Sequence, residues 1–117
     1  MQELTNKKIN LATKNMDKYE EMRNILDNYD LDLRVVDLKG TEIQAFSVLS
    51  VAEHSAKEIS TKTDEAFIVE DSGVYINSLY GFPGPYSSYI FNTIGNNGIL
   101  KLIGDNRDAQ FVAIIAF

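Results

Sequence analysis

The chain has 117 residues, of which 44% are hydrophobic and 24% are charged, the balance of an ordinary globular protein. Its 17 acidic residues outnumber 11 basic ones, and the formal charge of −6 argues against non-specific nucleic-acid binding, which needs a basic surface. The lack of cysteine excludes disulfides, thiolate catalysis and a cysteine-ligated zinc site. No apolar run approaches the ~20 residues that span a bilayer, and the N-terminus lacks a signal-peptide pattern. We therefore expect a cytoplasmic protein with neither a membrane nor a nucleic acid as its partner.

The first half of the chain predicts two strands and two helices. Residues 8–12 form a short apolar run bounded by polar residues, which is typical of a strand. Apolar residues recur at three- and four-residue spacing over 16–29, which predicts an amphipathic helix. Residues 30–38 predict a second strand ended by a Lys39-Gly40 turn, and 50–61 a second helix with Ser50 as a possible N-cap.

The second half adds strands around an acidic turn. Residues 66–70 predict a third strand, Glu70-Asp71-Ser72-Gly73 a turn, and 74–76 a short strand after it. Two further helices are expected over 86–94 and 97–103, and a last strand over 109–117. Because strands alternate with helices, the predicted fold class is α/β.

The last strand, FVAIIAF at 111–117, ends on an aromatic residue with no cap or polar tail. Such a run favours burial on both faces, so something else should cover it. We expect a fragment or a truncated form, or a chain that a partner completes. The alternative is a natural C-terminal core strand.

A possible phosphate grip lies between the first strand and the first helix, where Thr13, Asn15 and Lys18 give the spacing T-x-N-x-x-K. A helix N-terminus offers N–H groups and a positive dipole end, Asn15 can donate an amide, and Lys18 lies one turn into the helix. The alternative is that Thr13 or Asn15 only caps the helix and that Lys18 is a solvated residue. No P-loop sequence is present.

Two acidic positions could bind a metal ion. Asp71 follows a buried strand, where α/β sheets usually place their ligands, and a carboxylate there can orient Mg²⁺ and accept a proton from water. Glu42 follows the second strand and could join it, since Mg²⁺ is usually held by one or two carboxylates plus substrate phosphates. The alternatives are a β-turn acid and a surface loop acid. The single histidine, His54, receives no role.

Taken in chain order, T-x-N-x-x-K, E-I-Q, E-D-S-G, G-F-P-G-P-Y-S and R-x-A-x-F form one set. This set resembles that of the inosine/xanthosine triphosphate pyrophosphatase family, hydrolases that remove non-standard purine nucleotides. The resemblance covers essentially all 117 residues and looks closest to the archaeal members through GFPGPYSSY. It implies hydrolysis of ITP, dITP or XTP to the monophosphate and pyrophosphate with Mg²⁺ as cofactor.

The resemblance also assigns roles to single residues. Thr13, Asn15 and Lys18 match the triphosphate-binding motif of the family. Glu42 and Asp71 match its metal-binding acids, with Asp71 also the expected general base. Ser72 matches a substrate-contacting position.

The implied architecture is one α/β domain over residues 1–117, an elongated mixed sheet with flanking helices and a cleft between two lobes, usually in a homodimer. Family members continue for roughly another third of their length, with Gly-Tyr-Asp and Ser-His-Arg segments that read the purine and that this sequence lacks. We therefore expect weak Mg-triphosphate binding, little base selectivity and impaired catalysis. Two alternatives stay open: a Maf-like pyrimidine triphosphate pyrophosphatase, and a catalytically idle nucleotide-binding or dimerising remnant.

Overall fold

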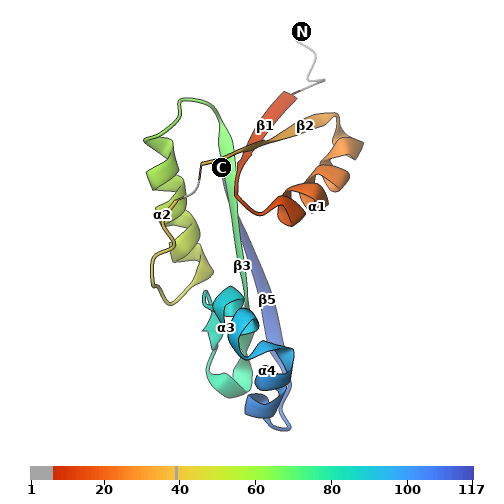
Figure 1. Ribbon diagram of the computed structural model, residues 1–117, viewed down its shortest axis with the longest axis vertical. Helices are drawn as coiled ribbons and strands as arrows, with labels where there is room; N and C mark the ends of the chain where they lie inside the picture. The colour runs from red at the N-terminus through yellow and green to blue at the C-terminus, as the bar shows by residue number, and fades with distance from the viewer. Residues whose placement is uncertain (1–6, 39) are drawn as a thin grey trace. The chain divides into compact units, whose positions relative to one another are not determined.

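The computed structural model describes residues 7–38 and 40–117, whose course is shown in Figure 1. Lys39, predicted to form a turn with Gly40, lies outside the described residues. The described chain divides into two compact units, each taken by itself below. Unit 1 holds the described residues up to Thr41, His54–Val69 and Ala116–Phe117, and unit 2 holds Glu42–Glu53 and Glu70–Ile115. The single domain and the cleft that the resemblance implies remain predictions.

Strands and helices alternate along the chain, as the sequence predicts. The elements in order are β1 (Lys7–Ala12), α1 (Met16–Leu26), the 3-10 turn η1 (Asp27–Tyr29), β2 (Leu31–Val36), α2 (Val48–Ser60), β3 (Phe67–Ile76), the 3-10 turn η2 (Asn77–Leu79), β4 (Pro83–Gly84), α3 (Ser87–Thr93), α4 (Gly95–Ile103) and β5 (Ala109–Ala116).

The sheet is mixed. In unit 1, β1 pairs in parallel with β2 along its whole length and with β3 through Leu11 opposite Ile68. In unit 2, β3 pairs antiparallel with β4, and β5 also pairs with β3. The predicted α/β class with a mixed sheet and flanking helices is confirmed.

Unit 1 buries both faces of its sheet because successive side chains of a strand point to opposite sides. On one face Leu11, Leu33 and Ile68 form a core against α1. On the other face Ala12 and Val69 pack against Ile59 of α2. Leu11 is fully buried, and burying such a side chain stabilises the fold by about 1.5–3 kcal/mol.

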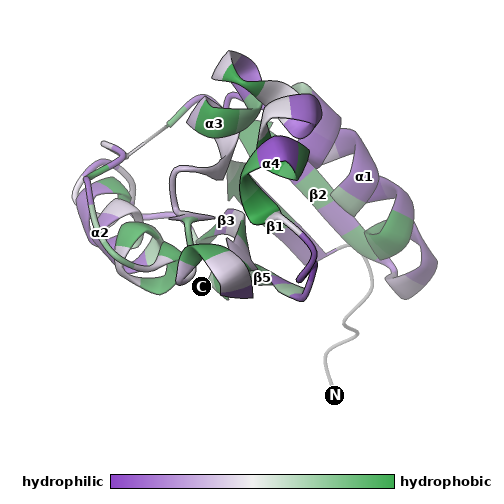
Figure 2. Ribbon diagram, turned by 90° about the horizontal axis from the view of Figure 1, so that it is seen from below, coloured by the Kyte–Doolittle hydropathy of each residue, from purple (hydrophilic) through white to green (hydrophobic). Residues whose placement is uncertain are grey.

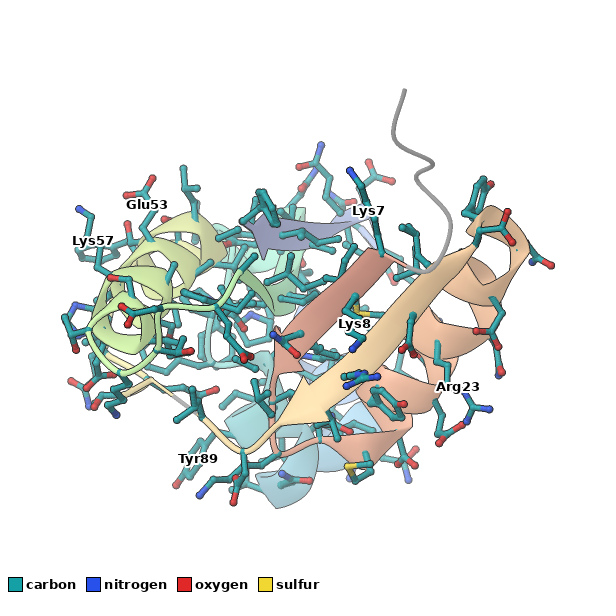
Figure 3. The ribbon with its side chains drawn as sticks, turned by 90° about the horizontal axis from the view of Figure 1, so that it is seen from above. Lys7, Lys8, Arg23, Glu53, Lys57 and Tyr89 are labelled. Carbon is teal, nitrogen blue, oxygen red and sulfur yellow. The ribbon has the colours of Figure 1, made fainter. Side chains whose placement is uncertain are left out.

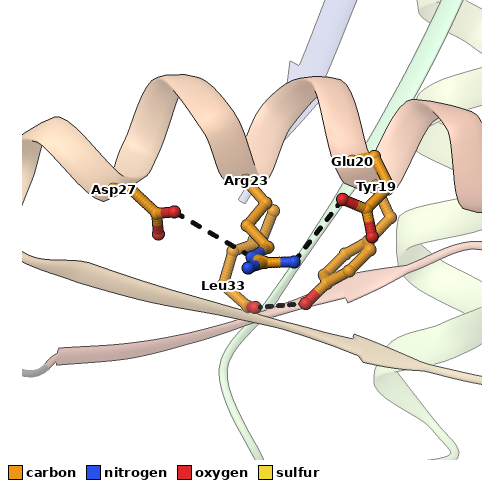
Figure 4. Close-up of polar contacts among 5 residues, drawn as sticks. All are labelled: Tyr19, Glu20, Arg23, Asp27 and Leu33. Carbon is orange, nitrogen blue, oxygen red and sulfur yellow. Dashed lines mark hydrogen bonds and ion pairs between the residues drawn. The ribbon is translucent and has the colours of Figure 1, made fainter.

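A side-chain hydrogen bond, drawn in Figure 4, links helix α1 to the sheet. The Tyr19 hydroxyl donates to the Leu33 carbonyl of β2 at 3.0 Å. Arg23 lies 3.5 Å from Glu20 and 3.9 Å from Asp27 on the same helix, and these exposed pairs contribute little to stability. Figure 2 shows hydrophobic and hydrophilic residues alternating along α1, the pattern from which the helix was predicted.

Unit 2 contradicts one prediction. The acidic turn expected at 70–73 is absent, because β3 runs without a break from Phe67 to Ile76. A Cβ on Gly73 would lie 2.2 Å from the Gly84 carbonyl oxygen of β4. Gly73 therefore allows two backbones to approach closely, and a glycine in a strand often has this role rather than that of a turn residue.

The start of α2 corrects a second prediction. Ser47, not Ser50, is at the N-terminus, since the Ser50 N–H donates to Ser47 Oγ at 3.1 Å and Ser50 lies inside the helix. The Val48 N–H donates to the Tyr75 hydroxyl at 2.9 Å, which ties the start of the helix to β3 within unit 2. Two of the helix's first N–H groups thus have partners.

Strand β5 keeps apolar side chains at the surface. Phe111 is 74% exposed and Ile115 60% exposed, although the strand pairs with β3. The apolar residues of β5, which were predicted to be buried on both faces of the strand, are thus only partly buried within unit 2. Among residues 7–38 and 40–117, no helix has both the length and the apolar character needed to cross a membrane.

Candidate active site residues

The first group of predicted site residues lies in unit 1, where β1 passes into α1. The Thr13 N–H donates to the Val36 carbonyl at 3.4 Å, which holds Thr13 at the carboxyl end of β1 beside β2. The Asn15 N–H donates to Thr13 Oγ1 at 3.0 Å, and Asn15 Oδ1 accepts from the Lys18 N–H at 3.1 Å. The three residues of the spacing T-x-N-x-x-K are therefore brought together at one helix N-terminus.

Asn15 caps α1, with extended backbone at φ −92° and ψ 101°. An asparagine cap satisfies one of the N–H groups that a helix leaves open at its start. The side-chain oxygen is used for this bond, so the amide NH2 is the part of Asn15 that could donate to a phosphate. Asn15 is exposed and Lys18 half-buried, so an anion could reach both. Capping and phosphate binding are compatible here.

The second group lies in unit 2, on β3. Asp71 Oδ1 accepts from the Ser72 N–H at 3.0 Å. Glu70 Oε2 and Asp71 Oδ2 are shut off from solvent. Asp71 was predicted at the end of a strand, but it lies in the middle of one, so the local backbone is held by the sheet on both sides of it.

Glu42 lies in the loop between β2 and α2 and is exposed. It belongs to unit 2, as do Asp71 and Ser72. Its neighbour Thr41 is held by two hydrogen bonds to Glu58 of α2. The predicted metal ligands are thus one acid on a loop and one on a strand.

The two predicted ligands, Glu42 and Asp71, are carboxylates, the ligand type that Mg²⁺ usually takes from a protein. Among the residues that the structure describes, no group of three or more His, Cys, Asp or Glu side chains could hold a metal ion. Mg²⁺ needs no such cage, since it keeps several waters and takes one or two carboxylates plus substrate phosphates. Glu42 and Asp71 could supply those carboxylates.

A pocket of about 510 Å³ opens in unit 2 beside Ser72. Its walls are mainly apolar, and the polar residues that line it are Ser72, Ser87, Ser88, Asn96 and Arg107. Ligand pockets commonly combine apolar walls with a few polar groups. No local pattern in the sequence indicates this pocket, because α3, α4 and β5 line it together with β3.

Two residues that support the site, Ser87 and Glu58, were not predicted from the sequence. Ser87 Oγ donates to the Gly84 carbonyl at 2.6 Å and accepts from the Val74 N–H at 2.9 Å, so it braces β3 and β4 next to Ser72. A serine at the start of a predicted helix was a weak local signal for it. No local sequence pattern indicated that Glu58 holds Thr41, because 17 positions separate the two residues.

A model of the Ham1 family matches residues 9–117. The chain belongs to the Ham1 family. The dITP/XTP pyrophosphatase of Methanopyrus kandleri is 43% identical over 112 residues, which cover 94% of this chain and 60% of that protein. The dITP/XTP pyrophosphatase of Korarchaeum cryptofilum is 44% identical over 107 residues, which cover 90% of this chain and 58% of that protein. The predicted resemblance to archaeal members is confirmed.

Solved structures show the same Ham1 fold. A HAM1 protein from Coxiella burnetii superposes with a TM-score of 0.75 at 22% identity, covering 94% of this chain and 62% of that one. The Staphylococcus aureus Ham1 protein superposes with a TM-score of 0.64 at 23% identity, covering 93% and 62%. This Ham1 chain spans about 60% of the length of the curated relatives it matches.

Proposed function

We propose that this Ham1-family chain hydrolyses non-standard purine nucleoside triphosphates, dITP, ITP and XTP, to the monophosphate and pyrophosphate with Mg²⁺. The setting of Asp71 supports this most directly. Its carboxylate is mounted on β3, where Oδ1 accepts from the Ser72 N–H. Relatives with 43% and 44% identity are named dITP/XTP pyrophosphatases, which supports the choice of reaction.

The residues of unit 1 would hold the triphosphate. Thr13 and Asn15 would donate to phosphate oxygens, and Lys18 would offset their negative charge, as cations and helix N-termini do. Ser72 would contact the substrate. A bound Mg²⁺ would neutralise phosphate charge and act as a Lewis acid, with Glu42 and Asp71 as its protein ligands.

Asp71 would also act on the attacking water. It accepts the proton as the water oxygen bonds to the α-phosphorus, and the bond from the α-phosphorus to the bridging oxygen breaks, so that pyrophosphate leaves. A positioned general base typically contributes about 10²–10⁴-fold to a rate. Asp71 is therefore the residue whose loss should matter most.

The test is pyrophosphate release with Mg²⁺ from dITP, XTP, ITP, GTP, TTP and UTP, comparing the chain with Asp71→Asn. Asp105→Asn is the matched control, because Asp105 is exposed and the variant changes the net charge equally. We expect release from the non-standard purines that falls about 10²–10⁴-fold in Asp71→Asn and not in the control. Equal rates of pyrophosphate release by all three proteins would contradict the proposal. The comparison with GTP tests the expected weak base selectivity.

One alternative is a catalytically idle remnant that binds nucleotide without turning it over. Triphosphate binding by calorimetry with no release from any substrate would favour this remnant. The Maf-like alternative predicts release from TTP or UTP, and the match to the Ham1 family disfavours it.

The homodimer and the cytoplasmic location are part of the same proposal. In unit 2, Phe46 and Tyr80 are fully exposed at the edge of an aromatic groove of about 430 Å³, and exposed apolar groups of this kind often mark contacts between proteins. Light scattering behind a sizing column should give the mass of two chains. A mass of one chain at every concentration would contradict the dimer and leave the proposed reaction standing.

A further inference from the structure

The loop between β2 and α2 is fastened to α2 at two successive residues. The Thr41 N–H donates to Glu58 Oε2, and Thr41 Oγ1 donates to Glu58 Oε1 at 3.0 Å. Both oxygens of one carboxylate are thus bonded to one loop residue. A two-point contact fixes orientation as well as position.

Gly40 adds a contact of a different kind. It is buried against α2, where an added Cβ would lie 2.7 Å from the Ser55 Cα. Ser55 comes one helical turn before Glu58 and therefore lies on the same side of α2. The helix thus holds Gly40 by close packing and Thr41 by hydrogen bonds, all within unit 1.

The Glu58 carboxylate is suited to this contact. The hydrogen bond from the Thr41 N–H lowers the pKa of Glu58 most, followed by the bond from the Thr41 hydroxyl, and Lys62 and His54 of the same region lower it further. Glu58 is therefore charged at neutral pH. Hydrogen bonds to an ionised acceptor are about twice as strong as neutral ones.

We propose that Glu58 is a positioning residue for the metal site: by fixing the Thr41 backbone, it sets the backbone of the adjoining Glu42, so that the Glu42 carboxylate is presented to the cation. This inference rests on the proposed function, in which Glu42 is a metal ligand. Glu42 is exposed and lies on a loop, so its own surroundings do little to hold it. Groups that support a ligand from behind commonly decide how well it binds metal.

The test is Mn²⁺ binding, measured by water proton relaxation in the presence of an unhydrolysable α,β-imido analogue of dITP. Glu58→Ala removes both bonds, and Glu58→Gln keeps an acceptor for the Thr41 N–H and supplies a donor for Thr41 Oγ1. Glu53→Ala is the matched control, since Glu53 lies on the outer side of the same helix, where Figure 3 labels it with Lys57. Amide hydrogen exchange at Thr41 reports the contact itself.

We expect Glu58→Ala to speed Thr41 exchange and to raise the Mn²⁺ dissociation constant about tenfold, the low end of what loss of an outer-shell partner costs. Glu58→Gln should fall between Glu58→Ala and the wild type, and Glu53→Ala should match the wild type. A merely structural role would lower the melting temperature of Glu58→Ala without changing Mn²⁺ binding.

Gly40→Ala gives a second and independent disturbance of the same loop. It leaves the Glu58 carboxylate in place but forces the backbone away from Ser55, so the Mn²⁺ dissociation constant should rise as in Glu58→Ala. Normal Mn²⁺ binding by both variants, or unchanged Thr41 exchange in Glu58→Ala, would overturn the inference and leave the proposed function intact. If the wild-type chain binds no Mn²⁺, the metal requirement of the proposed function fails and the inference fails with it.

Discussion

The two units differ in how completely they bury their own apolar side chains. Unit 1 covers both faces of its strands, with Leu11, Leu33 and Ile68 on one side and Ala12 and Val69 on the other. Unit 2 buries fewer large groups and leaves Phe46, Tyr80, Phe91 and Phe111 at its surface. Unit 1 is thus held mainly by its hydrophobic core, and unit 2 relies more on backbone contacts that particular small residues allow.

The first prediction breaks the core of unit 1. Leu11→Ala should lower the free energy of unfolding by about 2–5 kcal/mol, because Leu11 is fully buried and the lost side chain leaves a cavity. Urea unfolding followed by circular dichroism measures the change. Ile25→Ala is the control, since Ile25 is 61% exposed on α1 and should change stability by no more than about 0.5 kcal/mol. Similar losses in both variants would contradict the description of unit 1.

The second prediction tests the close approach of two backbones in unit 2. Gly73→Ala should lower the free energy of unfolding by about 3 kcal/mol. The added Cβ would lie 2.2 Å from the Gly84 carbonyl oxygen, so one strand must shift. Chemical denaturation gives the cost, and the Val74 amide signal in NMR reports the shift.

Gly95→Ala separates crowding from backbone strain. Gly95 has φ of +66° but no atom within 4 Å of an added Cβ, so its replacement should cost about 1–2 kcal/mol from the left-handed backbone alone. A larger loss at Gly95 than at Gly73 would show that crowding is not what constrains β3.

The third prediction concerns the brace at Ser87. Ser87→Ala removes a donor from the Gly84 carbonyl and an acceptor from the Val74 N–H, and should lower stability by about 1–3 kcal/mol. Thermal unfolding measures this change. The neighbouring Ser88→Ala is the control, because Ser88 is exposed, and equal effects in the two variants would argue against the brace.

The smallest expected change in stability comes at Asn15. Asn15→Ala should lower the free energy of unfolding by about 1 kcal/mol through loss of the helix cap. Asn15→Asp should keep the cap and leave the free energy of unfolding almost unchanged. If Asn15 also donates to phosphate, Asn15→Asp should nevertheless bind triphosphate more weakly than Asn15→Ala, because its carboxylate repels the anion. Calorimetry with dITP decides, and unchanged affinity in Asn15→Asp would remove Asn15 from the proposed site.

Local patterns predicted unit 1 well, since its elements follow apolar periodicity. Helix α1 was predicted to run through Tyr29, but it ends at Leu26, and the 3-10 turn that follows closes at Asp30 with φ of +56°. The T-x-N-x-x-K spacing was informative because the bonds that join Thr13, Asn15 and Lys18 to one another lie within one turn of the helix. The roles of these residues in binding stay predictions.

Non-local contacts account for what the sequence analysis missed. Ser72-Gly73 looks locally like a turn, but in the structure Gly73 lies within β3, where the Gly84 carbonyl approaches it closely. Glu58 looks like any surface acid of an amphipathic helix until Thr41 is seen against it. Pairs so far apart in the chain leave no periodic trace, so neither could be inferred from one sequence.

The parallel pairing of β1 with β3 also means that β1 is synthesised well before its partner strand. Asn10 of β1 bonds to the Ala66 carbonyl, 56 positions further along the chain. A ribosome adding about 5–20 residues per second needs about 3–11 s to cover that distance. During this interval Leu11 and Ala12 have left the ribosome without the strand that shields them, so the growing chain should be a client for chaperones that bind exposed apolar segments.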